Sequence, residues 1–242
     1  MKWFFSFNER ESIKVYIKGI LMSRNIVITG ANRGIGLALC AQFKAQGDQV
    51  FALCRKSSVE LAALDVNIIE HIDVATDLSI RAMVLALSHI DIDVLVCNAG
   101  ILRDESLGAI DINTIREQFE VNALAPLRVV DSLQKQLTLG AKVALITSRM
   151  GSIADNNSGG RYGYRMSKAA LNAAAMSLSH DLASKNVAVG IYHPGYVQTD
   201  MVNYGGDISA NDSANKLVKL INQLTLAETG VFKHSNGSIL PW

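Results

Sequence analysis

The sequence predicts an α/β protein built on a doubly wound parallel sheet of about seven strands, with helices on both faces of the sheet. From Asn25 onward, short runs rich in Val and Ile alternate with longer segments of helical periodicity, which is typical of strand–helix–strand units. Some of these runs are apolar at consecutive positions, as at residues 94–96, and strands that are buried on both faces show this pattern. Helices on both sides of a parallel sheet provide that burial.

The expected strands are Val- or Ile-rich runs, which in chain order are residues 25–29, 49–54, 67–72, 92–97, 141–147, 187–192 and 230–233. The segments between them have helical composition. An Ala-rich helix should begin near the glycines at 30–36 and end at Gly47, and further helices are expected at 111–138 and within 161–185. No linker, repeat or low-complexity tract separates these elements, so we expect one domain over residues 25–242.

The composition argues against several classes of protein. With 49% hydrophobic and 19% charged residues, the chain of 242 residues can bury enough surface to fold. A net charge of +1 and an aromatic content of 6% argue against a nucleic-acid partner. Cys40, Cys54 and Cys97 lie in apolar stretches and are expected to be reduced core residues. The His residues are scattered and no CxxC or HExxH motif occurs, so we expect no metal.

Residues 1–24 differ in composition from the rest of the chain because basic side chains outnumber acidic ones. These residues do not match a signal peptide, since polar residues follow Trp3–Phe5 and interrupt the apolar region that a signal peptide requires. An amphipathic stripe from Ile13 to Leu21 predicts a helix that docks on a membrane surface or a partner. The interpretation we favour is a flexible or upstream extension with Met22 as the natural start. No apolar run approaches the roughly 20 residues that cross a bilayer, so we expect no integral membrane segment and a cytoplasmic protein.

The turn after the first strand predicts a phosphate site. It comprises Gly30, Ala31, Asn32, Arg33, Gly34, Ile35 and Gly36. Such a turn presents backbone N–H groups and a helix N-terminus to a phosphate, and its glycines let a diphosphate approach the backbone. The spacing differs from GxGxxG, and a tight strand-to-helix connection can use glycine for its own sake. The position directly after the first strand favours a dinucleotide.

The end of the second strand predicts which dinucleotide binds. An acidic residue about 20 positions beyond the glycine turn would accept hydrogen bonds from the ribose 2′-hydroxyl of NAD, whereas a cation there suits the 2′-phosphate of NADP. This strand ends in Arg55 and Lys56 without an acid, and Arg33 in the glycine turn adds a further cation. Planar guanidinium groups suit phosphate oxygens. NADP(H) is therefore the predicted cofactor, with NAD(H) as the alternative.

The glycine turn, in the pattern TGxxxGxG, resembles that of the short-chain dehydrogenase/reductase family, and the resemblance extends over residues 25–242. It implies a Rossmann fold. Asn98, Ala99 and Gly100 close the fourth strand as the NAG motif of the family does, beside the cofactor. Asp73 follows the third strand, where the family has an Asp that bonds the adenine ring; a helix cap is the other interpretation of this residue.

Tyr164 and Lys168 match the YxxxK motif of the family, and their spacing places them on one face of the predicted helix. The resemblance implies that Tyr164 is the general acid/base. Lys168 would bind the nicotinamide ribose and favour the tyrosinate, lowering a pKa that is ordinarily near 10. A proton donor works best when its pKa is close to the working pH. Tyr162 cannot take this part, because residue 166 is Met.

Ser148 and Asn122 complete the catalytic set that the resemblance implies. Ser148 ends the fifth strand and would bond the carbonyl oxygen of the substrate, which stabilises developing negative charge. Asn122 would hold a water in a proton relay behind Lys168; a helix kink near Pro126 is the other interpretation of this residue. The separation between Ser148 and the tyrosine exceeds the common spacing of the family, with 155–160 as the insertion. Ser152 is therefore a weaker alternative for the serine role.

The segment after the sixth strand matches the PGxxxT element of the family. The resemblance implies that this loop contacts the nicotinamide carboxamide, through Pro194, Gly195, Val197 and Thr199. Residues 196–210 would then form a mobile lid over the substrate. An ordinary Pro-Gly turn is the alternative.

Arg55, the run 164–172 and the ending 237–242 are similar to those of the C-factor and sniffer-type carbonyl reductases. This similarity implies an NADP(H)-dependent oxidoreductase that interconverts a carbonyl and an alcohol, with hydride from nicotinamide C4 and the proton from Tyr164. The substrate would be a small molecule, and the substrate segments do not identify it. We also expect a homodimer or homotetramer, because many relatives pair through the helices at 111–138 and 161–185.

Two other functional classes were weighed against this enzyme. A dinucleotide-binding signalling or regulatory protein with little turnover would need the glycine turn, but it would have no reason to retain the catalytic residues. A serine hydrolase would need a GxSxG elbow, and Ser148 lies in the sequence ITSRM. The catalytic set therefore favours the oxidoreductase.

Overall fold

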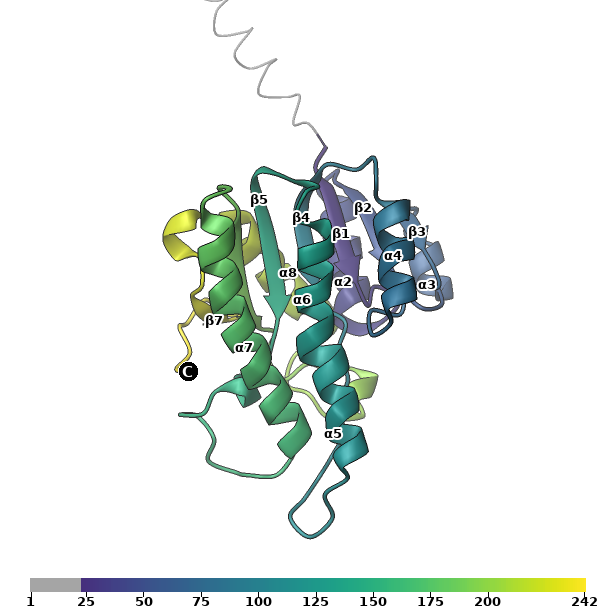
Figure 1. Ribbon diagram of the computed structural model, residues 1–242. Coiled ribbons are helices and arrows are strands. Elements are labelled where there is room, and N and C mark those ends of the chain that lie inside the picture. Colours follow the sequence, from purple (N-terminus) through teal and green to yellow (C-terminus); the bar gives the residue numbers. More distant parts are fainter. Residues whose placement is uncertain (1–22) are drawn as a thin grey trace, which may run out of the picture.

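Seven strands form one parallel sheet in the computed structural model, which describes residues 23–242 (Figure 1). The strands are β1 (Asn25–Thr29), β2 (Gln49–Leu53), β3 (Asn67–Ile69), β4 (Ile92–Cys97), β5 (Leu137–Ile146), β6 (Ala188–His193) and β7 (Phe232–His234). Their order across the sheet is β3-β2-β1-β4-β5-β6-β7. The predicted doubly wound fold is confirmed. The predicted extension lies outside the described residues except for Ser23 and Arg24, so both interpretations of it stay predictions.

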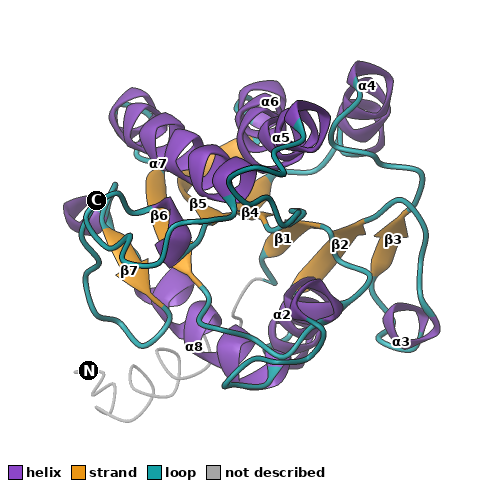
Figure 2. Cartoon of the chain, turned by 90° about the horizontal axis from the view of Figure 1, so that it is seen from below, coloured by secondary structure: helices purple, strands orange, loops and turns teal. Residues whose placement is uncertain are grey.

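Helices cover both faces of this sheet (Figure 2). The α-helices are α2 (Gly34–Ala45), α3 (Val59–Ala62), α4 (Asp77–Ala86), α5 (Ile112–Phe119), α6 (Ala125–Leu133), α7 (Tyr162–Ala183) and α8 (Ala210–Gln223). Helices α4 to α7 pack on one face, and α2, α3 and α8 pack on the other. Short 3-10 turns lie at η2 (Arg149–Gly151), η3 (Asp200–Val202) and η4 (Leu226–Glu228).

The core consists of two apolar layers, one on each face of the sheet. Along β1, Val27 belongs to the layer beneath α4, α6 and α7, whereas Ile26 and Ile28 belong to the layer beneath α2 and α8. Successive strand side chains point to opposite faces, so a strand between two helical layers must be apolar at every position. This requirement explains the uninterrupted Val and Ile runs of the sequence.

Three strands differ from their predicted bounds by two residues or more, for local reasons. β3 ends at Ile69 instead of residue 72, and His71 has a left-handed φ of 63° that is incompatible with a strand. β5 begins at Leu137 instead of residue 141, and its register against β4 shifts between Ile92 and Val94. β7 begins only at Phe232, beyond the left-handed Gly230. A hydrophobic pattern does not reveal these backbone events.

The region 111–138, which was predicted as helical, is divided by a single π-helical turn, η1 (Glu120–Leu124), between α5 and α6. Pro126 lies in the first turn of α6, where a missing backbone N–H is tolerated. π-Helical turns are rare and are often found at functional sites. This one contains Asn122, a member of the predicted catalytic set.

Helix N-termini differ in how their free N–H groups are satisfied. The N-cap residues that precede α4, α5 and α8 are Thr76, Asp111 and Ser209, and each of these side chains accepts a hydrogen bond from the first turn. The N-cap positions of α2 and α7 are occupied by Arg33 and Arg161, whose side chains make no capping hydrogen bond. The two long helices without a cap of their own are those that carry the glycine turn and Tyr164.

Within residues 23–242, the helices are too short or too polar to cross a membrane.

Candidate active site

A cavity of about 650 Å³ lies at the carboxyl ends of β1, β4 and β5. The sheet order reverses at this point, because β1 lies between β2 and β4, and ligands of doubly wound sheets bind at such a switch point. Most of the predicted cofactor residues line the cavity: Gly30, Asn32, Arg33, Gly34, Ile35, Arg55, Asp73, Asn98, Ala99, Gly100, Tyr164, Lys168, Pro194 and Thr199. The structure therefore brings together residues from the whole length of the predicted domain.

The glycine turn forms one wall of the cavity and depends on close backbone contacts. Gly30 and Gly34 have left-handed φ values of 66° and 55°. Gly36 does not line the cavity; a Cβ atom there would lie 2.2 Å from the carbonyl oxygen of Gly30. Gly36 thus lets α2 begin directly against the end of β1. The turn that results aims the uncapped N-terminus of α2 at the cavity.

Asn98 and Thr29 join the glycine turn to the end of β4. The Nδ2 atom of Asn98 donates hydrogen bonds to the carbonyl oxygens of Thr29 and Gly30, each at 3.1 Å. The Thr29 hydroxyl oxygen accepts from the backbone N–H groups of Asn98 at 3.0 Å and of Ala99 at 3.1 Å. These reciprocal bonds keep the two central strand ends in contact and explain why an Asn at this position supports the turn.

These features fit the diphosphate of a dinucleotide. α2 has neither a capping side chain nor an acidic residue in its first turn, so its N–H groups and positive dipole end are available to an anion. Arg55 at the end of β2 is exposed and lines the same cavity, whereas Lys56 is exposed and does not. The cavity therefore carries a positive charge where the sequence predicts the 2′-phosphate.

Asp73 lines the cavity beyond the end of β3 and does not cap the following helix. Its Oδ1 atom accepts a hydrogen bond from Ala75 N at 3.1 Å, and Thr76 is the N-cap of α4. Apolar side chains that the sequence analysis did not single out lie beside it: Leu37, Leu64, Ile72 and Val74. Ile72 and Val74 flank Asp73 in the sequence, and this pattern could have predicted that apolar side chains line the cavity next to Asp73.

Tyr164 and Lys168 lie on the buried side of α7, as their spacing predicted, with exposed fractions of 8% and 4%. The Nζ atom of Lys168 donates to the carbonyl oxygen of Ile146 at 2.9 Å and lies 5.8 Å from the centre of the Tyr164 ring. Burial lowers the pKa of Lys168 from 10.5 to about 8. The lysine is therefore held at the end of β5, beside the tyrosine.

Burial raises the pKa of Tyr164 above its ordinary value, and a hydrogen bond from Ser148 and the charge of Arg161 oppose this shift. Removing the phenolate from water outweighs these favourable contacts, and the lowering by Lys168 that the resemblance implies stays a prediction. The phenol consequently retains its proton at neutral pH. A protonated Tyr164 is the form that can donate a proton.

Ser148 lies two residues beyond the end of β5 and within hydrogen-bonding reach of Tyr164, although neither Ser148 nor Ser152 lines the cavity. The Ser148 hydroxyl oxygen also accepts from Met150 N at 3.1 Å, which caps the short turn η2. Ser152 is buried, and its hydroxyl oxygen accepts from Asp155 N at 3.1 Å. The geometry therefore favours Ser148 over Ser152 as the serine beside the tyrosine.

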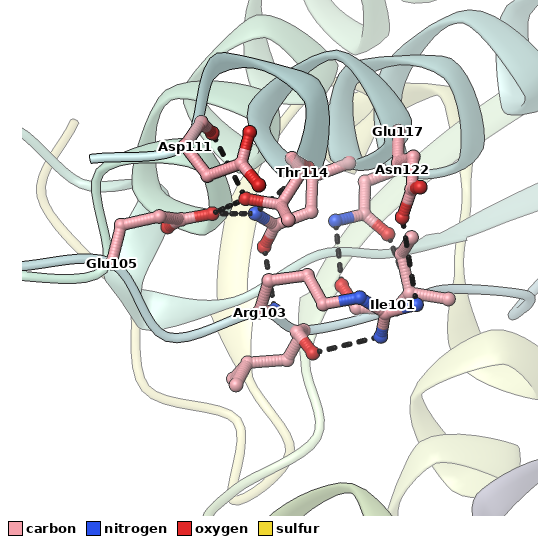
Figure 3. Close-up of polar contacts among 9 residues, drawn as sticks. Ile101, Arg103, Glu105, Asp111, Thr114, Glu117 and Asn122 are labelled. Carbon is pink, nitrogen blue, oxygen red and sulfur yellow. Dashed lines mark hydrogen bonds and ion pairs between the residues drawn. The ribbon is translucent and has the colours of Figure 1, made fainter. Parts of the chain in front are cut away.

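Asn122 is fully buried next to the cavity, and its side chain is engaged by protein atoms. Its Oδ1 atom accepts from Ile101 N at 2.8 Å, and Nδ2 donates to the Ile101 carbonyl oxygen at 2.8 Å (Figure 3). Nδ2 also donates to the Ser167 hydroxyl at 3.0 Å. Both N–H donors of the Asn122 amide are thus engaged, one with the loop after β4 and one with α7. The expected water relay cannot use these donors.

The predicted lid is attached to the glycine turn by an ion pair. Arg33 Nη1 lies 3.0 Å from Asp200 Oδ2 in the turn η3, although the two residues are 167 positions apart. A hydrogen bond from Tyr204 and the charge of Arg33 hold the pKa of Asp200 below its usual range. Pro194 and Thr199 line the cavity, whereas Gly195 and Val197 do not. Arg33, a predicted phosphate ligand, therefore has an acidic partner that the sequence did not reveal.

Comparison with known proteins agrees with this arrangement. Residues 24–209 match the short chain dehydrogenase family. The chain is 36% identical over 223 residues to 1-hydroxy-2-glutathionyl-2-methyl-3-butene dehydrogenase of Rhodococcus sp. (strain AD45), covering 90% of this chain and 99% of that protein. It is 42% identical over 154 residues to the C-signal protein of Myxococcus xanthus, covering 62% of this chain and 93% of that protein.

Solved structures show the same likeness. The NADPH-bound carbonyl reductase from chicken fatty liver is 27% identical with a TM-score of 0.81, covering 92% of this chain and 100% of that one. The carbonyl reductase Sniffer of D. melanogaster is 28% identical with a TM-score of 0.80, covering 91% of this chain and 100% of that one. The chain therefore belongs to the short-chain dehydrogenase family and is an oxidoreductase that uses a nicotinamide dinucleotide.

Proposed function

We propose that this protein is an NADPH-dependent carbonyl reductase that interconverts an aldehyde or ketone and the corresponding alcohol. The observation that carries the proposal is the placement of Tyr164 and Lys168 at one end of a cavity whose other wall is the uncapped glycine turn, with Ser148 next to the tyrosine. A nicotinamide bound there supplies a hydride to the carbonyl carbon. The 2′-phosphate preference rests on Arg55 and Arg33, and it agrees with the NADPH-bound carbonyl reductase among the similar structures.

Each catalytic side chain has a distinct part in this proposal. Tyr164 donates its proton to the carbonyl oxygen, because burial keeps the phenol protonated. Ser148 donates a hydrogen bond to the same oxygen and stabilises its developing charge. Lys168 binds the nicotinamide ribose and, in its charged form, stabilises the tyrosinate left after the transfer. Asn122 holds the loop after β4 in place through Ile101.

The experiment that tests the function follows the oxidation of NADPH and of NADH at 340 nm with a panel of aldehydes, ketones and quinones. The variant Tyr164→Phe serves as the blank. Turnover with NADPH that the variant loses is the expected result. Binding of NADPH without turnover on any member of the panel would contradict the enzyme and favour a dinucleotide-dependent regulator.

The double variant Arg55→Asp with Lys56→Ala should shift the preference from NADPH toward NADH. The new carboxylate repels a 2′-phosphate and accepts from a 2′-hydroxyl, so we expect at least a tenfold change in the ratio of kcat/KM values, or about 1.4 kcal/mol. Steady-state kinetics with both cofactors measures this ratio. Arg81→Asp, on the exposed side of α4, is the matched control. An unchanged ratio in the double variant would refute the cofactor assignment.

The variant Asp200→Asn should bind NADPH about twofold to fivefold more tightly than the wild type, which is the range expected for an exposed ion pair. Removing the carboxylate frees Arg33 for the 2′-phosphate and removes a negative charge from the cavity. Fluorescence titration gives the two dissociation constants, and the affinity for NADH, which lacks the 2′-phosphate, should change less. The control is Asp207→Asn, an exposed acid of the same segment. Weaker NADPH binding would contradict this prediction and would indicate that the ion pair between Arg33 and Asp200 helps to form the cofactor site.

We further propose that the enzyme is a cytoplasmic homodimer or homotetramer. Support for the compartment comes from its cysteines: Cys40 and Cys97 are buried and free, and burial raises the pKa of each thiol to about 12, which suits inert thiols in a reducing environment. Support for the assembly comes from apolar side chains exposed on the helices that many relatives pair through, among them Leu124, Leu127 and Met166.

A further inference from the structure

Glu105 is a buried carboxylate outside the set of residues assigned so far. It lies in the long loop between β4 and α5 and is only 3% exposed. Oε1 accepts from the Thr114 hydroxyl at 2.8 Å and from Gln118 Nε2 at 2.5 Å, and Oε2 accepts from Gly163 N at 3.1 Å. Figure 3 shows Glu105 turned toward α5, beside Thr114. Three hydrogen bonds thus hold this charge within the protein.

Two of the contacts of Glu105 replace the missing cap of α7. Arg161, at the N-cap position, has a left-handed φ of 49° and makes no side-chain cap. The Glu105 carbonyl oxygen accepts from Arg161 N at 2.8 Å, and its carboxylate accepts from Gly163 N across 58 positions of sequence. A carboxylate at this end of a helix also interacts favourably with the helix dipole. Glu105 therefore fixes the first turn of α7.

The same loop is fastened to α5 and η1 along its length. Gln118 Oε1 accepts from Arg103 N at 2.9 Å, and Asn122 binds both backbone groups of Ile101. The contact between the helices is close, since a Cβ atom on Gly163 would lie 2.4 Å from Gln118 Nε2 and 3.0 Å from Glu105 Oε1. Glu105 is thus the point where the loop, α5 and α7 meet.

We propose that Glu105 is a positioning residue, which fixes Tyr164 against Ser148 by anchoring the first turn of α7. Tyr164 directly follows Gly163, whose N–H is the group that the carboxylate holds. Helix ends fray unless their free N–H groups are bonded, and a displacement of about 1 Å at a reacting group can reduce a rate about 100-fold. The inference rests on the proposed function, in which Tyr164 donates the proton.

The variant Glu105→Gln tests this proposal. Glutamine has the same size, but its amide keeps only one accepting oxygen, so its NH2 group must face either the Gly163 N–H or the donors of Thr114 and Gln118. We expect kcat to fall about 10-fold to 100-fold, while the KM for the carbonyl and the Kd for NADPH stay within about twofold. Glu117→Gln makes the same change at an exposed position of α5, where Glu117 forms an ion pair with Arg103, and should retain full activity.

A milder variant guards against loss of folding. Thr114→Val removes one donor to Glu105 while keeping the shape of the side chain, and it should lower kcat about twofold to fivefold with the same unchanged Kd for NADPH. Wild-type kcat in both variants would overturn the proposal. The proposal would also be overturned if kcat fell only in parallel with the affinity for NADPH, since that result would indicate a general structural role.

The test separates this inference from the proposed function. If Tyr164→Phe retains turnover, the function assigned to the tyrosine fails and the positioning of that tyrosine loses its meaning. If Tyr164→Phe is inactive and Glu105→Gln retains its kcat, only the positioning role fails. A double variant adds a check: Glu105→Gln should reduce the residual rate of Tyr164→Phe less than it reduces the wild-type rate, because the hydroxyl that it positions is absent.

Discussion

Replacing Tyr164 with Phe should lower kcat about 100-fold to 10,000-fold and leave the Kd for NADPH within about twofold. The substitution removes one hydroxyl, which Ser148 contacts, and keeps the ring that packs near Lys168. Proton transfer then has no donor at the carbonyl oxygen, whereas the glycine turn and Arg55 remain intact. Single-turnover oxidation of bound NADPH measures the chemical step, and fluorescence titration measures the affinity.

Tyr162 offers a matched control for this experiment. It lies in the same first turn of α7, but it does not line the cavity. Tyr162→Phe should therefore retain the wild-type kcat. Equal losses in both variants would mean that the helix has been perturbed, and equal activity in both would show that the proton comes from another group.

Replacing Gly36 with Ala should raise the Kd for NADPH about 10-fold to 100-fold and lower the free energy of unfolding by about 1–3 kcal/mol. The added Cβ would lie 2.2 Å from the Gly30 carbonyl oxygen and 2.6 Å from Asn98 Nδ2, so the backbone of the turn must move. Helix propensity alone would have the opposite effect on stability, since alanine within a helix is favoured over glycine by about 1 kcal/mol. Urea unfolding and titration with NADPH measure the two quantities.

Gly237→Ala serves as the comparison for this prediction. Its φ of 92° is left-handed, and a Cβ there meets no atom within 4 Å. This variant measures the effect of adding a methyl group at a left-handed glycine where no atom clashes with it. We expect the free energy of unfolding to fall by about 1–2 kcal/mol and the affinity for NADPH to stay unchanged. If Gly36→Ala stabilises the protein, as propensity alone demands, the close approach at the turn does not exist in solution.

The fold could be predicted from the sequence because burial on two faces leaves a readable pattern. β1 and β4 have apolar residues at consecutive positions, and both strands were located correctly. The start of β5 was predicted wrongly, since the shift of register between Ile92 and Val94 is a backbone irregularity that does not change the hydrophobic pattern. The hydrophobic pattern did not show the π-helical turn, because one turn is too short to change its period; only the alternative interpretation of Asn122 as a helix kink pointed to an irregularity there.

The candidate site was predictable where function depends on local spacing. Tyr164 and Lys168 meet because one helix separates them by a turn, and the glycine turn acts through neighbouring residues. Contacts made across the fold were not predictable. The pairing of Arg33 with Asp200 depends on how the lid returns to the first strand, and an isolated acid carries no periodic signal. The pKa of Tyr164 depends on burial, which only the packed structure reveals.

The order of the strands in space also governs how the chain is made. β1 has β2 and β4 as neighbours, and the bond from Asn25 N to the Asp93 carboxylate, at the start of that second pairing, spans 68 positions of sequence. A ribosome that adds about 5 to 20 residues per second needs roughly 3 to 14 s to synthesise this interval. During that time one edge of β1 has no neighbour, and free strand edges promote association between chains. The central strand that later carries the glycine turn is thus the segment of the nascent chain most exposed to misassembly.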